Sequence, residues 1–287
     1  MRAHIGILGS SDAIAPYTSA FEHTRTSVAL VRVGDDERSL VDDPDVDGLL
    51  ILSPLTERNY WIKETLGAGK GAIALSPPAP SASEAKNLLK SAEDRGLPFS
   101  VVCEPLNLPE SLFPRGGEWG TLRYLRIDFQ VPRQWLGRRD AGVLSTHALW
   151  IHTLLEKLAG SRIDWLIART RSLAVARPTE DLATVQLAFE NGAEGMLEVN
   201  GLGGEARLRI LAQGDAGEFI CEEDLRPAYA EGLCFQMDSF AAALTGTLRT
   251  TSLRPDLSQI SRGMRFVDWV RHSARLEKGL YWHEMEL

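Results

Sequence analysis

Short apolar runs alternate with helical patterns over the first third of the chain. The predicted strands are residues 4–8, 27–33, 47–53, 71–75 and 99–103. The predicted helices are residues 12–25, 59–68 and 83–96, the last beginning at Ser83 as N-cap. Strands that alternate with helices in this way indicate βαβ units and a parallel sheet.

The pattern changes after a Pro/Gly stretch at residues 114–117. Alternating apolar positions predict strands at residues 122–131, 163–175, 182–189, 195–199, 207–212 and 218–221. Asn191 and Gly192 form a strong hairpin signal between two of these strands. Helical patterns cover residues 143–158, 235–244 and 257–276. This half is therefore predicted to be an antiparallel sheet with helices to one side.

The chain has 287 residues, a length that suggests two domains. We place the boundary near residue 117, giving a Rossmann-like dinucleotide-binding domain (residues 1–117) and a C-terminal domain (residues 118–287). The predicted class is α/β: a reduced Rossmann-type parallel sheet, followed by an α/β domain with an open, mostly antiparallel sheet.

The first predicted strand ends at Gly9, where the chain turns into a helical pattern. A doubly wound fold binds the pyrophosphate of a dinucleotide at this turn, through backbone N–H groups and the helix N-terminus. Of the glycines in the fingerprint G-x-G-x-x-G, residues 9–14 keep only the first. Gly9, Ser10 and Ser11 are candidate cofactor contacts, and a strand–turn–helix without a cofactor is the alternative.

Arg32 lies near the end of the second predicted strand, where an acidic residue normally holds the adenosine ribose. An arginine there can accept a 2′-phosphate, which favours NADP over NAD. Asp35, Asp36 and Glu37 follow at once and would repel that phosphate. A solvated charged loop is therefore the alternative interpretation.

Five short stretches share a pattern with one known family. Residues 43–54 read DPDVDGLLILSP, residues 66–70 LGAGK, residues 83–85 SEA, residues 92–96 AEDRG and residues 273–275 SAR. Together they resemble the Gfo/Idh/MocA family (glucose–fructose oxidoreductase, inositol dehydrogenase and relatives). The resemblance covers nearly the whole chain and is most specific in residues 43–109.

The resemblance implies a nicotinamide cofactor, NAD or NADP, and hydride transfer to or from a sugar-like hydroxyl or carbonyl. Ser53, Pro54 and Pro77 match family positions beside that cofactor. In many members the C-terminal sheet is a dimer or tetramer interface, so we expect a homo-oligomer through it. A small-molecule substrate or ligand is the expected partner.

Several positions depart from the family pattern. The family's Glu-Lys-Pro is Leu75-Ser76-Pro77 here, so Ser76 replaces the lysine, and Arg58 stands in place of a histidine. The family's helical motif D-x-G-x-H-x-x-D aligns with Thr146, Ala148, Trp150 and Thr153. Only 13 residues separate Val33 from Asp47. Because members usually fit a helix and a strand there, one βα unit beside the adenosine subsite is expected to be missing.

Hydride transfer to a carbonyl needs a proton donor near the oxygen. His147, Ser76 and Trp150 are the candidate catalytic residues. His147 lies roughly 60° around the predicted helix from Trp150, whereas His152 lies roughly 160° away. A satisfied surface or interface histidine is the alternative for His147, and Ser76 requires an adjacent base.

Two charged groups are candidates for binding the substrate. Glu104 follows the last strand of the first half, at the edge where open α/β sheets bind ligands; a capping or turn role is the alternative. Arg138, with its neighbours Arg133, Trp135 and Arg139, forms a cationic, aromatic loop that suits an acidic or sugar-phosphate ligand. A solvated loop is the alternative there. Arg58 is a candidate for holding the cofactor or an anionic substrate, or else a solvated helix-start arginine.

Composition narrows the classes of function. The net charge of -8 argues against a nucleic-acid partner. No apolar run approaches the roughly 18 residues of a membrane span, and no signal peptide is recognised, so a cytoplasmic location is expected. Three cysteines without a C-x-x-C predict neither a disulfide framework nor a zinc site, and no other metal site is expected. A Ser-His-Asp hydrolase would need a G-x-S-x-G elbow, which is missing from the sequence.

Two functions remain open. The first is an NAD(P)-dependent oxidoreductase with a rebuilt site. The alternative is a non-catalytic ligand-binding, regulatory or scaffolding protein that keeps the fold. An enzyme should place an ionisable group near the nicotinamide position, whereas a binding protein can fill it with side chains such as Trp150 and Leu75.

Overall fold

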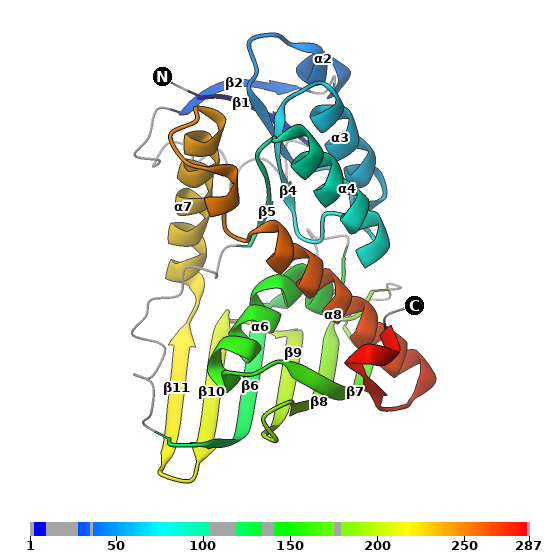
Figure 1. Cartoon of the computed structure of the whole chain (residues 1–287), viewed down its shortest axis with the longest axis vertical. Helices are drawn as coiled ribbons and strands as arrows, with labels where there is room; N and C mark the ends of the chain where they lie inside the picture. The colour runs from blue at the N-terminus through cyan, green and yellow to red at the C-terminus, as the bar shows by residue number, and fades with distance from the viewer. Residues whose placement is uncertain are drawn as a thin grey trace. The chain divides into compact units, whose positions relative to one another are not determined.

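The computed structural model describes residues 3–9, 28–34, 37–103, 119–133, 141–174 and 179–285 (Figure 1). The chain forms two compact units. Unit 1 comprises Met1–Asn107 and Ala228–Met264, and unit 2 comprises Leu108–Pro227 and Arg265–Leu287. The segment Ala228–Met264 therefore belongs with the first sheet, although the sequence pattern assigns it to the second domain.

Unit 1 is built on a five-stranded parallel sheet in the order β2-β1-β3-β4-β5. The strands are β1 (Ala3–Leu8), β2 (Val28–Gly34), β3 (Gly48–Ile51), β4 (Gly71–Leu75) and β5 (Phe99–Val102). Every residue of β3 and β5 is buried, as expected where helices cover both faces of a parallel sheet. The predicted Rossmann-type parallel sheet is confirmed.

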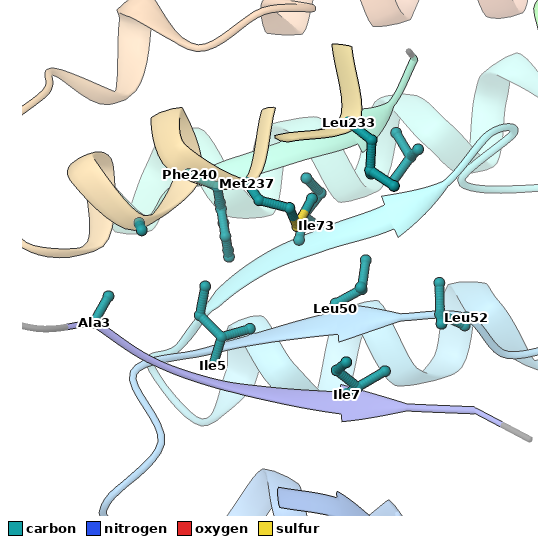
Figure 2. Close-up of a cluster of buried hydrophobic side chains, with 11 residues drawn as sticks. Ala3, Ile5, Ile7, Leu50, Leu52, Ile73, Leu233, Met237 and Phe240 are labelled. Atoms are coloured by element: carbon teal, nitrogen blue, oxygen red, sulfur yellow. The ribbon is translucent and has the colours of Figure 1, made fainter. Parts of the chain in front are cut away.

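Helices cover the two faces of this sheet. They are α2 (Glu37–Asp42), α3 (Leu55–Gly67), α4 (Ala82–Arg95) and α7 (Arg226–Leu244). In Figure 1, α3 and α4 lie on one side of the sheet and α7 on the other. Figure 2 shows Leu233, Met237 and Phe240 of α7 directed toward Ile5 and Leu50 of the strands, within one buried apolar cluster.

Two helix starts differ from the predicted ones. The N-cap of α4 is Ser81 rather than Ser83, because the Ser81 hydroxyl accepts the Glu84 N–H at 3.2 Å. Helix α3 begins directly after Pro54, four residues before the predicted start at Asn59. The end of α4 at Gly96, in a left-handed conformation, agrees with the prediction.

Among the described residues, the sheet has five strands, one fewer than a complete dinucleotide-binding sheet. The described residues between β2 and β3, 37–47, contain the six-residue helix α2 and no strand. In this sheet, β2 pairs only with β1 and so forms the edge. The loss of one βα unit stays a prediction, with which the described residues are consistent.

Lys70 closes the amino end of the same sheet. It follows α3, and its side chain is only 9% exposed. Its ammonium donates hydrogen bonds to the main-chain oxygens of Asp43 and Val46, the latter at 2.6 Å. The Lys70 ammonium thus binds two main-chain carbonyls of the acidic loop that precedes β3.

Unit 2 is built on a seven-stranded sheet in the order β11-β10-β6-β9-β8-β7-β12. The strands are β6 (Leu122–Pro132), β7 (Ile163–Arg171), β8 (Leu182–Phe189), β9 (Glu194–Gly203), β10 (Arg207–Gly214), β11 (Glu218–Asp224) and β12 (Leu280–Tyr281). Only the pair β6–β9 is parallel. The predicted open, mostly antiparallel sheet is confirmed, and Gly192 forms the predicted β8–β9 hairpin turn with a φ of 82°.

Helix α6 (Val143–Ala159) packs on one face of this sheet (Figure 1). Buried Ile127 and Phe129 alternate along β6 with partly exposed Arg126 and Asp128. The second face therefore carries polar and charged side chains. Helix α8 (Leu257–Leu276) begins in unit 1 and ends in unit 2.

Candidate functional site

The strand order of unit 1 defines one particular edge as the place for a ligand. The chain runs from β1 to β2 on one side, then crosses to β3 on the other side of β1. In open α/β sheets, ligands bind outside the carboxyl ends of the strands at such a switch point. Here the residues concerned are Gly9 after β1 and Ser53 and Pro54 after β3.

Gly9 is required by close packing at this switch point. A Cβ atom added to Gly9 would lie 2.8 Å from the Cβ of Leu52. The Leu52 N–H also donates to the Leu8 oxygen at 2.7 Å, which continues the β1–β3 pairing beyond the strand ends. A glycine at position 9 therefore allows the chain after β1 to pack directly against Leu52, independently of any role in cofactor binding.

Arg58 joins the loops that follow β3 and β4. Its Nε and Nη2 donate to the Ser53 main-chain oxygen at 3.1 and 2.9 Å, and its Nη1 donates to the Pro77 oxygen at 2.7 Å. The side chain is 1% exposed, so the alternative of a solvated arginine is wrong. A planar fork of donors suits this task, because one rigid group reaches both carbonyls.

Two serines lie in the loops that Arg58 joins. Ser53 is 1% exposed, and its hydroxyl has no hydrogen-bond partner among the described residues. Ser76 follows β4 directly and is 6% exposed. Both predicted site serines therefore lie at the carboxyl end of the sheet, beside Pro54 and Pro77.

Gln236 of α7 fixes the end of β5, and no sequence signal identified it. Its side-chain oxygen accepts the Cys103 N–H at 2.9 Å. Its amide nitrogen donates to the main-chain oxygens of Val101 at 3.2 Å and Arg254 at 3.1 Å. The buried Gln236 amide thus forms hydrogen bonds with the β5 main chain that a neighbouring strand would otherwise form.

In unit 2, His147 and Trp150 share one aromatic neighbour. Their rings meet Phe129 of β6 edge-on, with centroid separations of 4.9 and 4.7 Å. His147 is 2% exposed, so it is not a surface histidine, and the alternative of a satisfied interface histidine stays open. The structure brings these two candidates together on the sheet side of α6, in agreement with the predicted angle between them.

The other polar residues of α6 are engaged within unit 2. The hydroxyls of Thr146 and Thr153 donate to the main-chain oxygens of Gly142 and Leu149, one helical turn back. His152 Nε2 lies 3.6 Å from a carboxylate oxygen of Glu156, and its ring packs against Phe266. The two threonine hydroxyls and His152 are therefore engaged in contacts within unit 2.

Glu180 caps the start of α6, a contact that the sequence did not predict. Its carboxylate accepts the Ser145 N–H at 3.3 Å and the Ser145 hydroxyl at 3.2 Å. Arg271 donates to the same hydroxyl at 2.6 Å. A Cβ atom on Gly142 would lie 2.0 Å from the Glu180 carboxyl carbon, so a larger residue at the helix N-cap would displace this carboxylate.

Several predicted residues lie outside the described ranges. These are Ser10, Ser11, Glu104 and Arg138; of Arg32, only the backbone, within β2, is described. Arg133 is described and exposed, and it donates to the Ala174 oxygen at 2.8 Å.

Other chemistries find little support in the described residues. No group of three histidine, cysteine or acidic side chains there is arranged to hold a metal ion. All three cysteines are free, and burial raises the pKa of the Cys221 and Cys234 thiols, which disfavours thiolate chemistry at neutral pH. A hollow of about 510 Å³ along β7 and β8 contains none of the predicted site residues. None of the described helices is both long and apolar enough to cross a membrane.

Comparison with known proteins identifies the fold. No protein-family model matches the chain. The uncharacterized oxidoreductase YrbE of Bacillus subtilis (strain 168) is 25% identical over 177 residues, which is 58% of this chain and 52% of that protein. The aligned part thus spans about half the length of that relative.

Solved structures match over almost the whole chain. GenD2 from gentamicin A biosynthesis, in complex with NAD, has a TM-score of 0.82 at 15% identity and covers 98% of this chain and 96% of its own. The WlbA dehydrogenase of Bordetella pertussis, with NADH and UDP-GlcNAcA, has a TM-score of 0.78 at 16% identity, covering 98% and 97%. The scyllo-inositol dehydrogenase of Lactobacillus casei, with NAD(H) and scyllo-inositol, has a TM-score of 0.77 at 11% identity, covering 98% and 99%. This chain therefore has the two-part fold of these dehydrogenases.

Proposed function

We propose that this protein is a Gfo/Idh/MocA-type oxidoreductase that uses NAD or NADP and acts on a sugar-like hydroxyl or carbonyl. The switch point between β1 and β3, with the close-packed Gly9 turn, carries the proposal. The fold shared with NAD-bound dehydrogenases and the weak similarity to a curated oxidoreductase support it.

The residues at this edge suit the nicotinamide side of such a cofactor. Ser53 offers a buried hydroxyl that lacks a partner among the described residues, and Pro54, which follows it, is exposed. Arg58 holds the Ser53 and Pro77 carbonyls in place, so the loops that would meet the ring are fixed before binding. The bound cofactor would supply the hydride acceptor or donor.

Ser76 stays a candidate catalytic residue at the unit 1 edge, and His147 and Trp150 stay candidate catalytic residues within unit 2. The Ser76 hydroxyl, in place of the family's lysine, would donate a hydrogen bond to the substrate oxygen. His147, which packs against Phe129, stays the candidate proton carrier. Trp150 would form an apolar wall. Glu104 and Arg138, both outside the described residues, stay candidate substrate contacts.

Cofactor binding is tested first by thermal unfolding with NAD, NADH, NADP and NADPH. A ligand at 100 times its Kd should stabilise the fold by about 2.7 kcal/mol. The absence of any shift with all four at millimolar concentration would remove the oxidoreductase proposal. Once a substrate is found, His147→Gln should reduce turnover strongly, and unchanged turnover would clear His147 of the proton-carrying role.

One observation favours the alternative of a non-catalytic ligand-binding member. Arg58, which replaces a histidine of the family pattern, directs three donors to main-chain carbonyls rather than outward. Cofactor binding without turnover on a panel of polyols and sugar acids would favour this alternative. The two functions thus differ in turnover and not in fold.

We also propose that the polar face of the second sheet pairs with another copy of the chain. Met196 and Ile220 are 37% and 62% exposed, on strands β9 and β11. Ile220→Glu should then lower the molar mass measured by analytical ultracentrifugation, and an unchanged mass would argue against this surface. The cytoplasmic location stays a prediction.

A further inference from the structure

The two halves of the unit 1 sheet differ in completeness. A dinucleotide-binding fold is built from two mononucleotide-binding halves of three strands each, in the order 3-2-1-4-5-6. On one side of the switch point, this sheet has the full set β3, β4 and β5, connected by α3 and α4. On the other side it has only β1 and β2.

The incomplete half is the one that holds adenosine in this fold. The adenosine ribose is bound where β2 ends, roughly 20 residues after the glycine turn. In the described part of the chain, no strand lies beyond β2. The short helix α2 is placed over the sheet instead, since a Cβ on Gly6 would lie 3.2 Å from the Leu40 side chain. Arg38 further ties α2 to Glu64 of α3.

The complete half is fixed at each of its strand ends. Arg58 holds the loops after β3 and β4, and Gln236 holds the end of β5. Ordering these loops in advance removes an entropic cost from ligand binding. Contacts with the nicotinamide mononucleotide half are therefore prepared, whereas on the adenosine side the described sheet ends at β2.

From this difference, we propose that the nicotinamide mononucleotide half provides most of the affinity for the cofactor, and that the adenosine half adds little. The inference rests on the proposed function. A consequence is weak discrimination between NADH and NADPH, because these differ only by a phosphate on the adenosine ribose.

Calorimetric titration of the full chain with four probes tests the proposal: reduced nicotinamide mononucleotide, AMP, NADH and NADPH. We expect the reduced mononucleotide to bind within tenfold of NADH and AMP to bind at least tenfold more weakly than the mononucleotide. NADH and NADPH should differ by less than tenfold. Any one of these ratios falling outside its limit would overturn the inference while leaving the proposed function in place. If NADH, NADPH and the mononucleotide all fail to bind, both are wrong.

Two variants, one at the N-cap of α3 and one within the helix, locate the site. Pro54→Trp places a bulky ring at the exposed carboxyl end of β3 and should weaken both NADH and the reduced mononucleotide more than tenfold. Lys63→Trp adds the same ring to an exposed position farther along α3 and should leave both affinities within twofold. Circular dichroism verifies that both variants fold. Unchanged affinity for the mononucleotide in a folded Pro54→Trp would overturn the inference.

Discussion

In the described part of the chain, each end of the parallel sheet contains one buried cation, and the two cations bind different numbers of loops. Lys70 donates to two carbonyls of a single loop before β3. Arg58 donates to carbonyls of two separate loops, after β3 and after β4. Both belong to the segment around α3, at its opposite ends.

The difference follows from the shapes of the two side chains. An ammonium is a compact point charge, which satisfies oxygens gathered around one position. A guanidinium is a planar fork that holds two groups at a fixed separation. Lys70 thus holds one loop at the amino end, whereas Arg58 fixes the distance between two loops at the proposed ligand edge.

Removing the Arg58 guanidinium is expected to have the largest effect on stability and on cofactor affinity. Arg58→Met leaves the Ser53 and Pro77 carbonyls buried without their donor, so the free energy of unfolding should fall by about 3 kcal/mol. NADH affinity should fall with it, because the two loops lose their fixed spacing. Urea unfolding and calorimetry measure the two quantities.

Arg58→Lys is the matched control for charge. It keeps a cation but not the fork, so it should recover part of the stability and little of the affinity. Full recovery of NADH affinity by lysine would show that charge alone matters at this end, and the contrast with Lys70 would disappear.

Gln236→Leu tests the contact that holds the carboxyl end of β5. A leucine of similar size removes the hydrogen bonds to the Cys103 N–H and the Val101 oxygen, so the free energy of unfolding should fall by about 2 kcal/mol. Gln236→Glu retains the acceptor for Cys103 and loses the donors. If urea unfolding shows both variants to be as stable as the parent, the amide does not hold β5.

Lys70→Met tests the buried cation at the amino end of the sheet. The variant should lose about 1.5 kcal/mol of stability, because two carbonyls lose a charged donor. NADH affinity should stay the same, since the amino end of the sheet lies away from the proposed ligand edge. A loss of affinity as large as that of Arg58→Met would mean that both ends act through general stability.

The smallest effect is expected for Gly71→Ala, also at the amino end. The new Cβ would lie 2.5 Å from the Leu244 Cδ2 atom, the far end of a flexible side chain. Adjustment of Leu244 should limit the loss to about 1 kcal/mol. A much larger loss in thermal unfolding would indicate that α7 cannot adjust against the strands.

Local periodicity was sufficient to predict most of the elements. Residues 182–189 and 257–276 coincide with β8 and α8, because alternation and helical spacing are strong there. Ser81 directly precedes α4, whereas Ser83 is its second residue, so Ser83 was the wrong choice of N-cap. Glu84 lies three residues after Ser81, the spacing of a capping box, and this signal could have decided between them.

The residues that build the site were less accessible to prediction. Gln236 bonds residues more than 130 positions away, and Glu180 caps a helix that begins near residue 143. Such contacts depend on which distant segments fold together, and apolar spacing does not reveal that. Arg58 was found only because it departs from a family pattern, and its burial was not foreseen.

The position of α7 in the chain has a consequence for synthesis of the protein. Leu233, Met237 and Phe240 cover the apolar side chains of Ile5 and Leu50, yet all of Leu108–Pro227 is made before them. At ordinary translation rates this interval lasts on the order of 10 s. A nascent chain of about the first hundred residues therefore presents a bare apolar surface at the ribosome, where a chaperone can bind it.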